Sequence, residues 1–239
     1  MNANVSVNQP NGSSEMKSKV LKRMLQVVVQ FLVLAAILFI SSGRLDWVWA
    51  WVYLGVGVTI LAINVLVMPP EVIAERGRTD KEGIKSWDRV LTTLSILPTL
   101  GTPIMAGLDV RFGWSPQLAL AIQIVALVVW ALAQGLFTWA MVSNRFFSTS
   151  VRIQADRGHT VASGGPYRYV RHPGYVGYIT ASFATALALG SLWALIPAGL
   201  TMCLLVVRTA LEDRTLQEEL NGYKEYARQV RYRLLPGVW

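Results

Sequence analysis

Five long stretches without Asp, Glu, Lys or Arg dominate the pattern of apolar and polar positions along the chain. These stretches are Met24–Gly43, Trp47–Pro70, Val90–Leu108, Phe112–Asn144 and Gly174–Val207. Because a helix needs about 20 apolar residues to cross a bilayer core, the first three stretches each predict one membrane span. Gly113, Ser115 and Pro116 are typical of a turn, so the fourth span is predicted at roughly Leu118–Met141.

The fifth stretch is too long for one crossing, and Gly190 and Ser191 divide it into two short pieces. Such pieces favour a tight helical hairpin, tilted or sunk into one membrane face. The chain is therefore predicted to be an all-α polytopic membrane protein with about six transmembrane helices. Residues 1–20, rich in Asn and Ser at their start, are expected to form a disordered N-terminus. Residues 21–144 are expected to form a four-helix transmembrane region, and residues 145–239 carry the polar motifs.

The composition supports a membrane protein and excludes several other classes. Of the 239 residues, 53% are hydrophobic and only 15% are charged, whereas about a quarter of the residues in a soluble domain are charged. The stretch Met24–Gly43 exceeds the apolar core of a cleavable signal peptide and is expected to be retained. The single cysteine, Cys203, excludes disulfides within the chain and cysteine-ligated zinc. His159 and His172 have no cysteine partners, so no metal centre is expected.

The basic residues predict the orientation in the membrane. All 22 lysines and arginines except Arg44 and Arg111 lie before the first span, between the second and third, between the fourth and fifth, or after the last. By the positive-inside rule these segments face the cytoplasm, which places both termini there. The net charge of +8 is then explained by basic loops facing anionic lipid, and no nucleic-acid partner is expected.

Polar chemistry is concentrated in two segments, Arg145–Pro173 and Arg208–Trp239, which flank the predicted hairpin. Because a hairpin returns the chain to the face from which it started, the two segments are expected to meet. A site between them would be accessible from both the cytosol and the inner leaflet. We expect its partners to be membrane lipids and a lipophilic small molecule.

The first segment ends at a predicted helix start. Gly164, Gly165 and Pro166 favour a turn, and Pro173 suits the first position of the next helix, with His172 before it. The free N–H groups of a helix start can hold a carboxylate or phosphate, and Arg171 would add positive charge. The alternative is that Arg171 and His172 only anchor this helix at the lipid headgroups.

The second segment begins with Arg208 and Glu212, which are four residues apart and share one helix face. As an ordinary ion pair within a helix they would stabilise it by only about 0.2–0.5 kcal/mol. The remainder of the segment is predicted to be a C-terminal amphipathic helix that lies on the cytoplasmic face of the bilayer.

These residues resemble the isoprenylcysteine carboxyl methyltransferase family, which are integral membrane enzymes that use S-adenosylmethionine (SAM). The resemblance covers Arg152 to about Pro236. It is carried by Gly165-Pro-Tyr-(x)3-Arg171-His-Pro-x-Tyr175-x-Gly177, then by Arg208-(x)3-Glu212-Asp213-(x)2-Leu216, and by Tyr223-(x)2-Tyr226-(x)3-Val230. Asp213 stands where a second glutamate is commoner in the family.

The resemblance implies a SAM pocket and two catalytic residues. The implied cofactor-binding residues are Gln154, His159, Thr160, Val161, Ala162, Tyr167, Arg171, His172, Pro173, Gly174, Tyr175 and Glu212. Strict spacing would favour Arg152 over Gln154. The resemblance assigns Glu212 to the SAM ammonium and Arg208 to the substrate, both as catalytic residues. The implied reaction is carboxyl methylation of a prenylcysteine-like acceptor.

Three alternatives remain open from the sequence. The His-Pro-x-Tyr pattern and the C-terminal tyrosines also resemble membrane sterol reductases, which use NADPH. Phospholipid N-methyltransferases share Arg-His-Pro-x-Tyr, and an amine acceptor would need a proton acceptor such as Glu212 or Tyr226. In a lipid-binding or scaffold protein without catalysis, Arg208 and Glu212 would be incidental.

Overall fold

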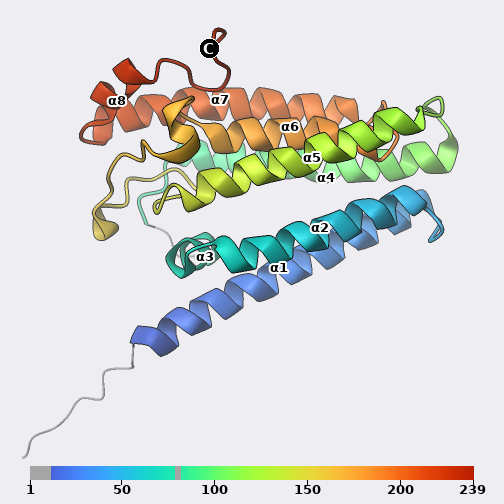
Figure 1. The fold of residues 1–239 in the computed structure, drawn as a ribbon, viewed down its shortest axis with the longest axis horizontal. Coiled ribbons are helices and arrows are strands. Elements are labelled where there is room, and N and C mark those ends of the chain that lie inside the picture. The colour runs from blue at the N-terminus through green and yellow to red at the C-terminus, as the bar shows by residue number, and fades with distance from the viewer. Residues whose placement is uncertain (1–11, 79–81) are drawn as a thin grey trace, which may run out of the picture.

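The computed structural model describes residues 12–78 and 82–239, and these form helices joined by turns and loops, without a strand (Figure 1). The helices are α1 (Gly12–Ser42), α2 (Val48–Val67), α3 (Pro70–Gly77), α4 (Ser86–Phe112), α5 (Leu120–Val142), α6 (Pro173–Ala188), α7 (Leu195–Glu219) and α8 (Tyr223–Gln229). Two short 3-10 turns, Ala155–Arg157 and Gly165–Arg168, lie in the loop between α5 and α6. The predicted all-α fold is confirmed.

Five helices, α1, α2, α4, α5 and α7, are long and apolar enough to cross a membrane. The sixth predicted crossing is α6, which has 16 residues and is shorter than the roughly 20 that a full crossing requires. It runs beside α5 and is followed by α7, which returns along it (Figure 1). The predicted hairpin is therefore present, with one short helix and one long helix of 25 residues.

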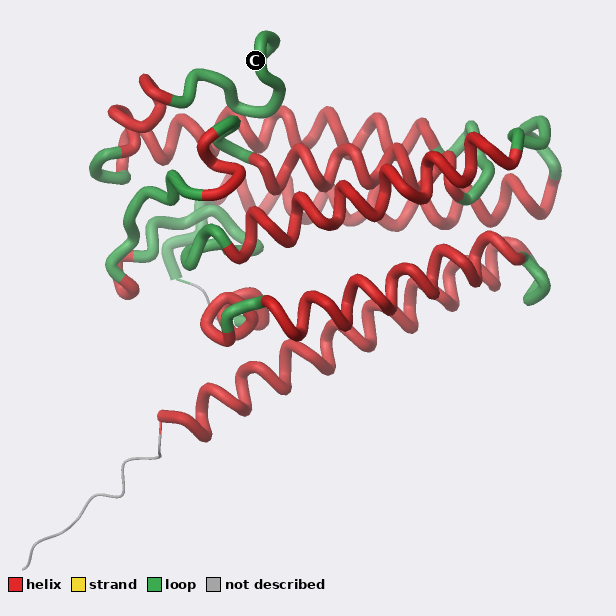
Figure 2. The backbone as a smooth tube through the Cα atoms, in the orientation of Figure 1, coloured by secondary structure: helices red, strands yellow, loops and turns green. Residues whose placement is uncertain are grey.

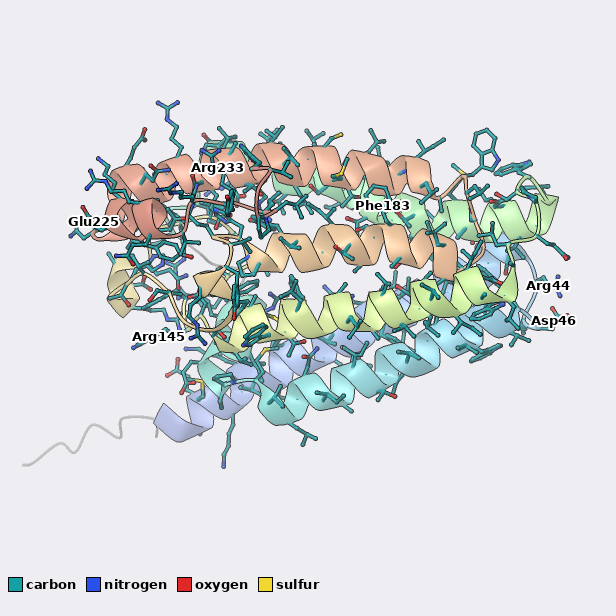
Figure 3. All side chains as sticks on the ribbon, turned by 45° about the horizontal axis from the view of Figure 1, so that its top comes forward. Arg44, Asp46, Arg145, Phe183, Glu225 and Arg233 are labelled. Atoms are coloured by element: carbon teal, nitrogen blue, oxygen red, sulfur yellow. The ribbon has the colours of Figure 1, made fainter. Side chains whose placement is uncertain are left out.

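The connections gather at the two ends of the bundle (Figure 2). One end holds three turns, at residues 43–47, 113–119 and 189–194. The other holds α3, residues 143–172 and residues 220–239, and we call it the basic end. Figure 3 shows Arg145 and Glu225 at the basic end, and Arg44 and Asp46 at the opposite end. The two polar segments of the sequence thus lie at the same end, as predicted, while the cytoplasmic orientation of that end stays a prediction.

Small residues let α5 and α6 approach closely. A Cβ atom on Gly177 would lie 2.7 Å from the carbonyl oxygen of Ala133 and 3.1 Å from the backbone nitrogen of Phe137. Ala181 and Ala184 continue this side of α6 in the buried core. Close approach of this kind stabilises helix pairs in lipid, where apolar burial gives little driving force. The pairing of α5 with α6 fixes the position of the start of α6, where Arg171 and His172 lie.

Hydrogen bonds around Asp109 close the opposite end of the bundle. The Asp109 carboxylate accepts hydrogen bonds from the backbone and hydroxyl of Ser115 and from the hydroxyl of Ser191. Gly190 precedes Ser191 with φ of 80°, a left-handed conformation that glycine adopts readily. This arrangement ties the end of α4 to the hairpin turn.

Three sequence predictions need correction. α1 begins at Gly12, so residues 12–20 are helical rather than disordered, while residues 1–11 lie outside the described part. The C-terminal helix is much shorter than expected, because α7 continues to Glu219 and only Tyr223–Gln229 is helical after it. The segment Pro70–Gly77, which was assigned to a loop, forms α3. A helix can extend past its apolar stretch because its backbone hydrogen bonds do not depend on side-chain polarity.

Candidate functional site

A cavity of about 780 Å³ opens at the basic end between the helices and the loop that precedes α6. It contains residues of every helix except α2. The predicted site residues that line it are Gln154, His159, Thr160, Val161, Ala162, Tyr167, Arg171, His172, Gly174, Tyr175, Arg208 and Glu212. Pro173 does not line the cavity and is instead buried at the first position of α6. The structure thus brings together residues from both polar segments.

Glu212 faces the cavity without a cationic partner among the described residues. Its Oε2 atom accepts a hydrogen bond of 2.5 Å from the Tyr175 hydroxyl. Arg208, one turn earlier on α7, does not form an ion pair with it. A direct ion pair between Arg208 and Glu212 is therefore absent, although Arg208 is near enough to interact with the carboxylate electrostatically.

Arg208 pairs instead with Asp88, a buried residue near the start of α4. Its Nε atom lies 2.8 Å from Oδ1 of Asp88, and its Nη2 atom donates to the carbonyl oxygen of Thr149. The other Asp88 oxygen accepts from the backbone N–H of Val151 at 2.8 Å. The guanidinium also lies 5.5 Å from the ring centroid of Tyr175. These contacts fix Arg208 at the cavity wall with much of its charge balanced.

Asp213, the neighbour of Glu212, is fully buried and saturated with donors. It accepts hydrogen bonds from Arg171 (2.7 and 3.0 Å), Arg233 (2.9 Å), Gln217 (2.9 Å) and the hydroxyl of Tyr223 (3.0 Å). We call Asp213 and these four residues the Asp213 cluster. It joins α7 to the start of α6 and to the C-terminal segment.

Arg171 was predicted to hold the cofactor, but most of its donors are used within the protein. Besides its two bonds to Asp213, its Nη1 atom donates to the carbonyl oxygens of Val230 and Arg231, both at 2.7 Å. These four bonds leave one of the five guanidinium N–H groups. Arg171 therefore lines the cavity mainly as the residue that holds the tail in place.

The start of α6 offers fewer free N–H groups than the sequence suggested. The backbone N–H groups of Arg171 and His172 donate to the carbonyls of Tyr232 and Arg233 at 2.9 Å, and that of Tyr175 donates to His172. Within the described residues, the N–H of Gly174 alone has no acceptor at this helix start. The His172 ring stacks on Tyr175, with 5.8 Å between centroids.

The Nε2 atom of His172 is a buried polar atom without a hydrogen bond in the described part of the chain. It lies 3.5 Å from Oδ1 of Asp213, where the carboxylate attracts it electrostatically but the geometry does not make a hydrogen bond. Buried polar atoms are nearly always satisfied, so one that is not points to a missing partner such as a ligand or water. This atom lies on the same cavity wall as Tyr175 and Glu212.

The loop before α6 is held by its own polar groups. The amide of Gln154 donates to the carbonyl of Phe146 and accepts from Arg157, both at 2.6 Å, so its side chain is already engaged. His159 Nδ1 accepts from the backbone N–H of Gln154 at 3.3 Å. Burial, together with the charges of Arg152 and Arg157, lowers the pKa of His159 to about 4. His159 is therefore neutral at pH 7.

Three tyrosines that line the cavity have their hydroxyls hydrogen-bonded within the protein. Tyr226 donates to the carbonyl of Tyr167 at 2.7 Å, and Tyr223 donates to Asp213. Burial raises the pKa of Tyr167, Tyr223 and Tyr226 well above that of free tyrosine. All three are therefore neutral hydrogen-bonding groups, and their ring surfaces supply an aromatic lining.

Sequence reasoning missed several residues of the site that come from the first half of the chain. Arg76 and Arg23 were treated only as parts of basic flanks, and Asp88 and Glu75 were not considered. Glu75 is buried within 3.3–3.7 Å of Arg152, Arg157 and Arg78. A carboxylate at the edge of an apolar stretch is a usable signal, because such a charge must find a partner.

The fold and the cavity define a polytopic α-helical membrane protein with a polar site at one end. Residues 124–218 match the sequence model of the isoprenylcysteine carboxyl methyltransferase (ICMT) family. This match confirms the resemblance and extends it toward the N-terminus into α5, while the tyrosines after residue 218 lie outside it. A comparison with curated proteins finds no match. The family that this model describes consists of methyltransferases that act on isoprenylcysteine carboxyl groups.

Proposed function

We propose that this protein is a SAM-dependent methyltransferase that methylates the carboxylate of a lipophilic, prenylcysteine-like acceptor at the cytoplasmic membrane face. The observation that carries the proposal is the Glu212 carboxylate, which lines the cavity, accepts a hydrogen bond from Tyr175 and forms no direct ion pair among the described residues, since its neighbour Arg208 pairs with Asp88. An ionised group in a partly buried site is costly unless a counter-charge approaches it. The ammonium group of SAM is such a counter-charge.

The polar and aromatic groups that line the cavity fit SAM. Glu212 would accept from the ammonium, and the orphaned Nε2 of His172 and the Gly174 N–H offer further polar contacts. Tyr167, Tyr175 and Tyr226 supply ring surfaces near a cationic sulfonium, an arrangement that is favourable for cations. When bound, SAM supplies an electrophilic methyl group.

The protein's contribution to the reaction would be placement and exclusion of water. A carboxylate acceptor is already ionised at neutral pH, so no side chain has to remove a proton. Arg208, held by Asp88 and Thr149, is a fixed donor that can orient the acceptor from the cavity wall. Positioning of two reactants in near-attack geometry can supply about 7–11 kcal/mol of a reaction barrier.

The apolar side of the cavity supports access of the acceptor from the membrane. Val33 of α1 and Ile96 of α4 both line the cavity and are 48% and 55% exposed on the outer surface of the helices. In a membrane-embedded bundle this surface faces lipid. A lipophilic molecule could therefore reach the site between α1 and α4, while a polar cofactor reaches it from the basic end.

Two catalytic alternatives predict different ligands. A sterol reductase would bind NADPH in place of SAM. A phospholipid N-methyltransferase would bind SAM but needs a proton acceptor for its amine substrate. Tyr226 is unsuited to that role because its hydroxyl donates a hydrogen bond to the Tyr167 carbonyl. Glu212 is then the candidate.

Calorimetric titration of the detergent-purified chain with SAM and, separately, with NADPH tests the proposal. We expect SAM to bind and NADPH not to bind. Glu212→Gln should weaken SAM by about 10- to 150-fold, because a hydrogen bond to a charged group contributes roughly 1.5–3 kcal/mol. The matched control is Glu218→Gln, which alters an exposed glutamate of the same helix that pairs with Arg214. Equal SAM affinity in the two variants, or binding of NADPH alone, would contradict the assignment.

A further inference from the structure

Two arginines that line the cavity have no carboxylate partner within residues 12–78 and 82–239. Arg23 of α1 has one hydrogen bond in that part of the chain, a long contact of 3.4 Å to Gln26. Arg76 of α3 has no hydrogen bond or ion pair there, and contacts the ring faces of Phe137 and Phe147 at 5.5 and 5.4 Å. The two residues are close to each other, because Gly77 packs against the Arg23 side chain.

The lack of partners at these two positions contrasts with the other arginines around the cavity. Arg208 pairs with Asp88, Arg171 with Asp213, and Arg152 with Glu75 and Asp156. Glu75 directly precedes Arg76, yet its carboxylate is directed to Arg152, Arg157 and Arg78. The unpaired positive charge is therefore a local property of the α1–α3 side of the cavity.

Arg76 is held in surroundings that disfavour an uncompensated charge. Burial, together with the nearby charge of Arg23, lowers the pKa of Arg76 to about 10. Arg76 is still charged at neutral pH, so two like charges face one cavity with little water around one of them. Binding of an anion between them would offset both the repulsion and the desolvation.

This charged pair lies at one end of an apolar arm of the cavity. On α1 the cavity is lined by Arg23 and then by Val29, Val33 and Ile37, and on α4 by Ile96 and Leu100. Arg23 and Ile37 are 14 residues apart, and at 1.5 Å per residue this stretch of helix rises about 21 Å. This side of the cavity is therefore long enough for an extended lipid chain whose polar end stays beside the arginines.

We propose that Arg76, assisted by Arg23, binds the anionic headgroup of the acceptor and so selects a carboxylate over an uncharged acceptor. This inference rests on the proposed function, which supplies the acceptor. It assigns an anion site to the α1–α3 side of the cavity, outside the region that matches the family. Phe147 connects this site to the SAM-facing wall, since its ring packs against Gly174 at the start of α6.

The test uses the full-length purified protein and two probes, N-acetyl-S-farnesylcysteine and its carboxamide. Binding of each probe is measured by calorimetry without SAM, and SAM binding is measured separately. The wild-type protein should bind the acid at least tenfold more tightly than the amide. Arg76→Gln should reduce the affinity for the acid to that for the amide, leave amide binding unchanged, and leave SAM binding within twofold. Unchanged amide binding also shows that the variant is folded.

Two further variants sharpen the result. Arg76→Lys keeps the charge and should retain a preference for the acid, and Arg168→Gln, which changes an exposed arginine outside the cavity, should behave as wild type. Persistence of the acid preference in Arg76→Gln would overturn the proposal. A loss of SAM affinity in Arg76→Gln would overturn it too, because the anion would then be the SAM carboxylate.

The remaining outcomes show whether the bound anion is a bulk phospholipid, and they distinguish failure of the anion site from failure of the proposed function. If phosphatidylglycerol displaces the acid at equal concentration, the site binds bulk phospholipid and the inference is wrong. If wild-type protein binds no SAM but Arg76→Gln still abolishes the preference for the acid, the proposed methyltransferase function fails while the anion site stands. If the wild-type protein binds SAM normally but does not distinguish the acid from the amide, the anion site fails while the proposed methyltransferase function stands.

Discussion

Glu212 and Asp213 are adjacent carboxylates on the same helix, yet their surroundings differ completely. Asp213 is fully buried and receives hydrogen bonds from four side chains. Glu212 accepts one hydrogen bond, from Tyr175, and faces the cavity. Successive residues of a helix point about 100° apart, so one turn of α7 serves both the protein interior and the ligand. The comparison separates a carboxylate that holds the fold together from one that faces the cavity.

The largest expected effect is on stability when the Asp213 cluster is broken. Asp213→Asn leaves Arg171 and Arg233 without their counter-charge, and loss of one partner from a buried ion pair costs about 3–5 kcal/mol. We expect a corresponding fall in the free energy of unfolding, measured in detergent without SAM. Glu212→Gln is the matched control and should stay within about 0.5 kcal/mol of wild type, because glutamine can still accept from Tyr175. Equal losses in both variants would remove the distinction.

A smaller effect is expected from the tyrosine that docks the C-terminal segment. Tyr226→Phe removes the hydroxyl that donates to the Tyr167 carbonyl, and should lower the free energy of unfolding by about 1 kcal/mol. Tyr232, which is 38% exposed, provides the comparison. Tyr232→Phe should leave the denaturation midpoint unchanged. A neutral Tyr226→Phe would show that the remaining contacts of the segment hold it without this hydrogen bond.

The smallest expected effect is a pH dependence from the loop before α6. The pKa of His159 is about 4 in the folded protein, whereas it is about 6.5 in an unfolded chain. Between these values the unfolded state binds more protons, so stability falls as the pH is lowered from about 6.5 toward 4. The thermal midpoint should therefore decrease from pH 7 to pH 5. His159→Gln should flatten this decrease, and an identical slope in the variant would exclude His159 as its source.

The spans could be predicted from the sequence because apolar length is a direct requirement of the membrane. The ends of α1 and α7 could not, since both helices continue into charged residues where composition changes but backbone hydrogen bonding does not. The short α3 was missed for a related reason. Its eight residues carry too little periodicity to be distinguished from a loop.

The site was predictable where spacing along the chain determines proximity. His172 and Tyr175 lie one helical turn apart, and the hairpin brings Glu212 to them. Pairings across the fold could not be read in this way. Arg208 was expected to act with Glu212 four residues away, but it bonds Asp88, 120 residues earlier. Arg171 was expected to contact the cofactor, but its guanidinium bonds Asp213. A buried carboxylate needs hydrogen-bond donors, and the sequence does not show which donors the fold places beside it.

The Asp88–Arg208 bond has a consequence for comparing this chain with its relatives. It joins α4 to α7, and Lys85 and Glu219 add a second link of 2.6 Å between the same two regions. The segment that matches the family is thus anchored to a helix outside the match. A chimera that exchanges acceptor selectivity should therefore be cut between α3 and α4, so that α4 stays with the half that contains the family match and α1–α3 are supplied by the other parent.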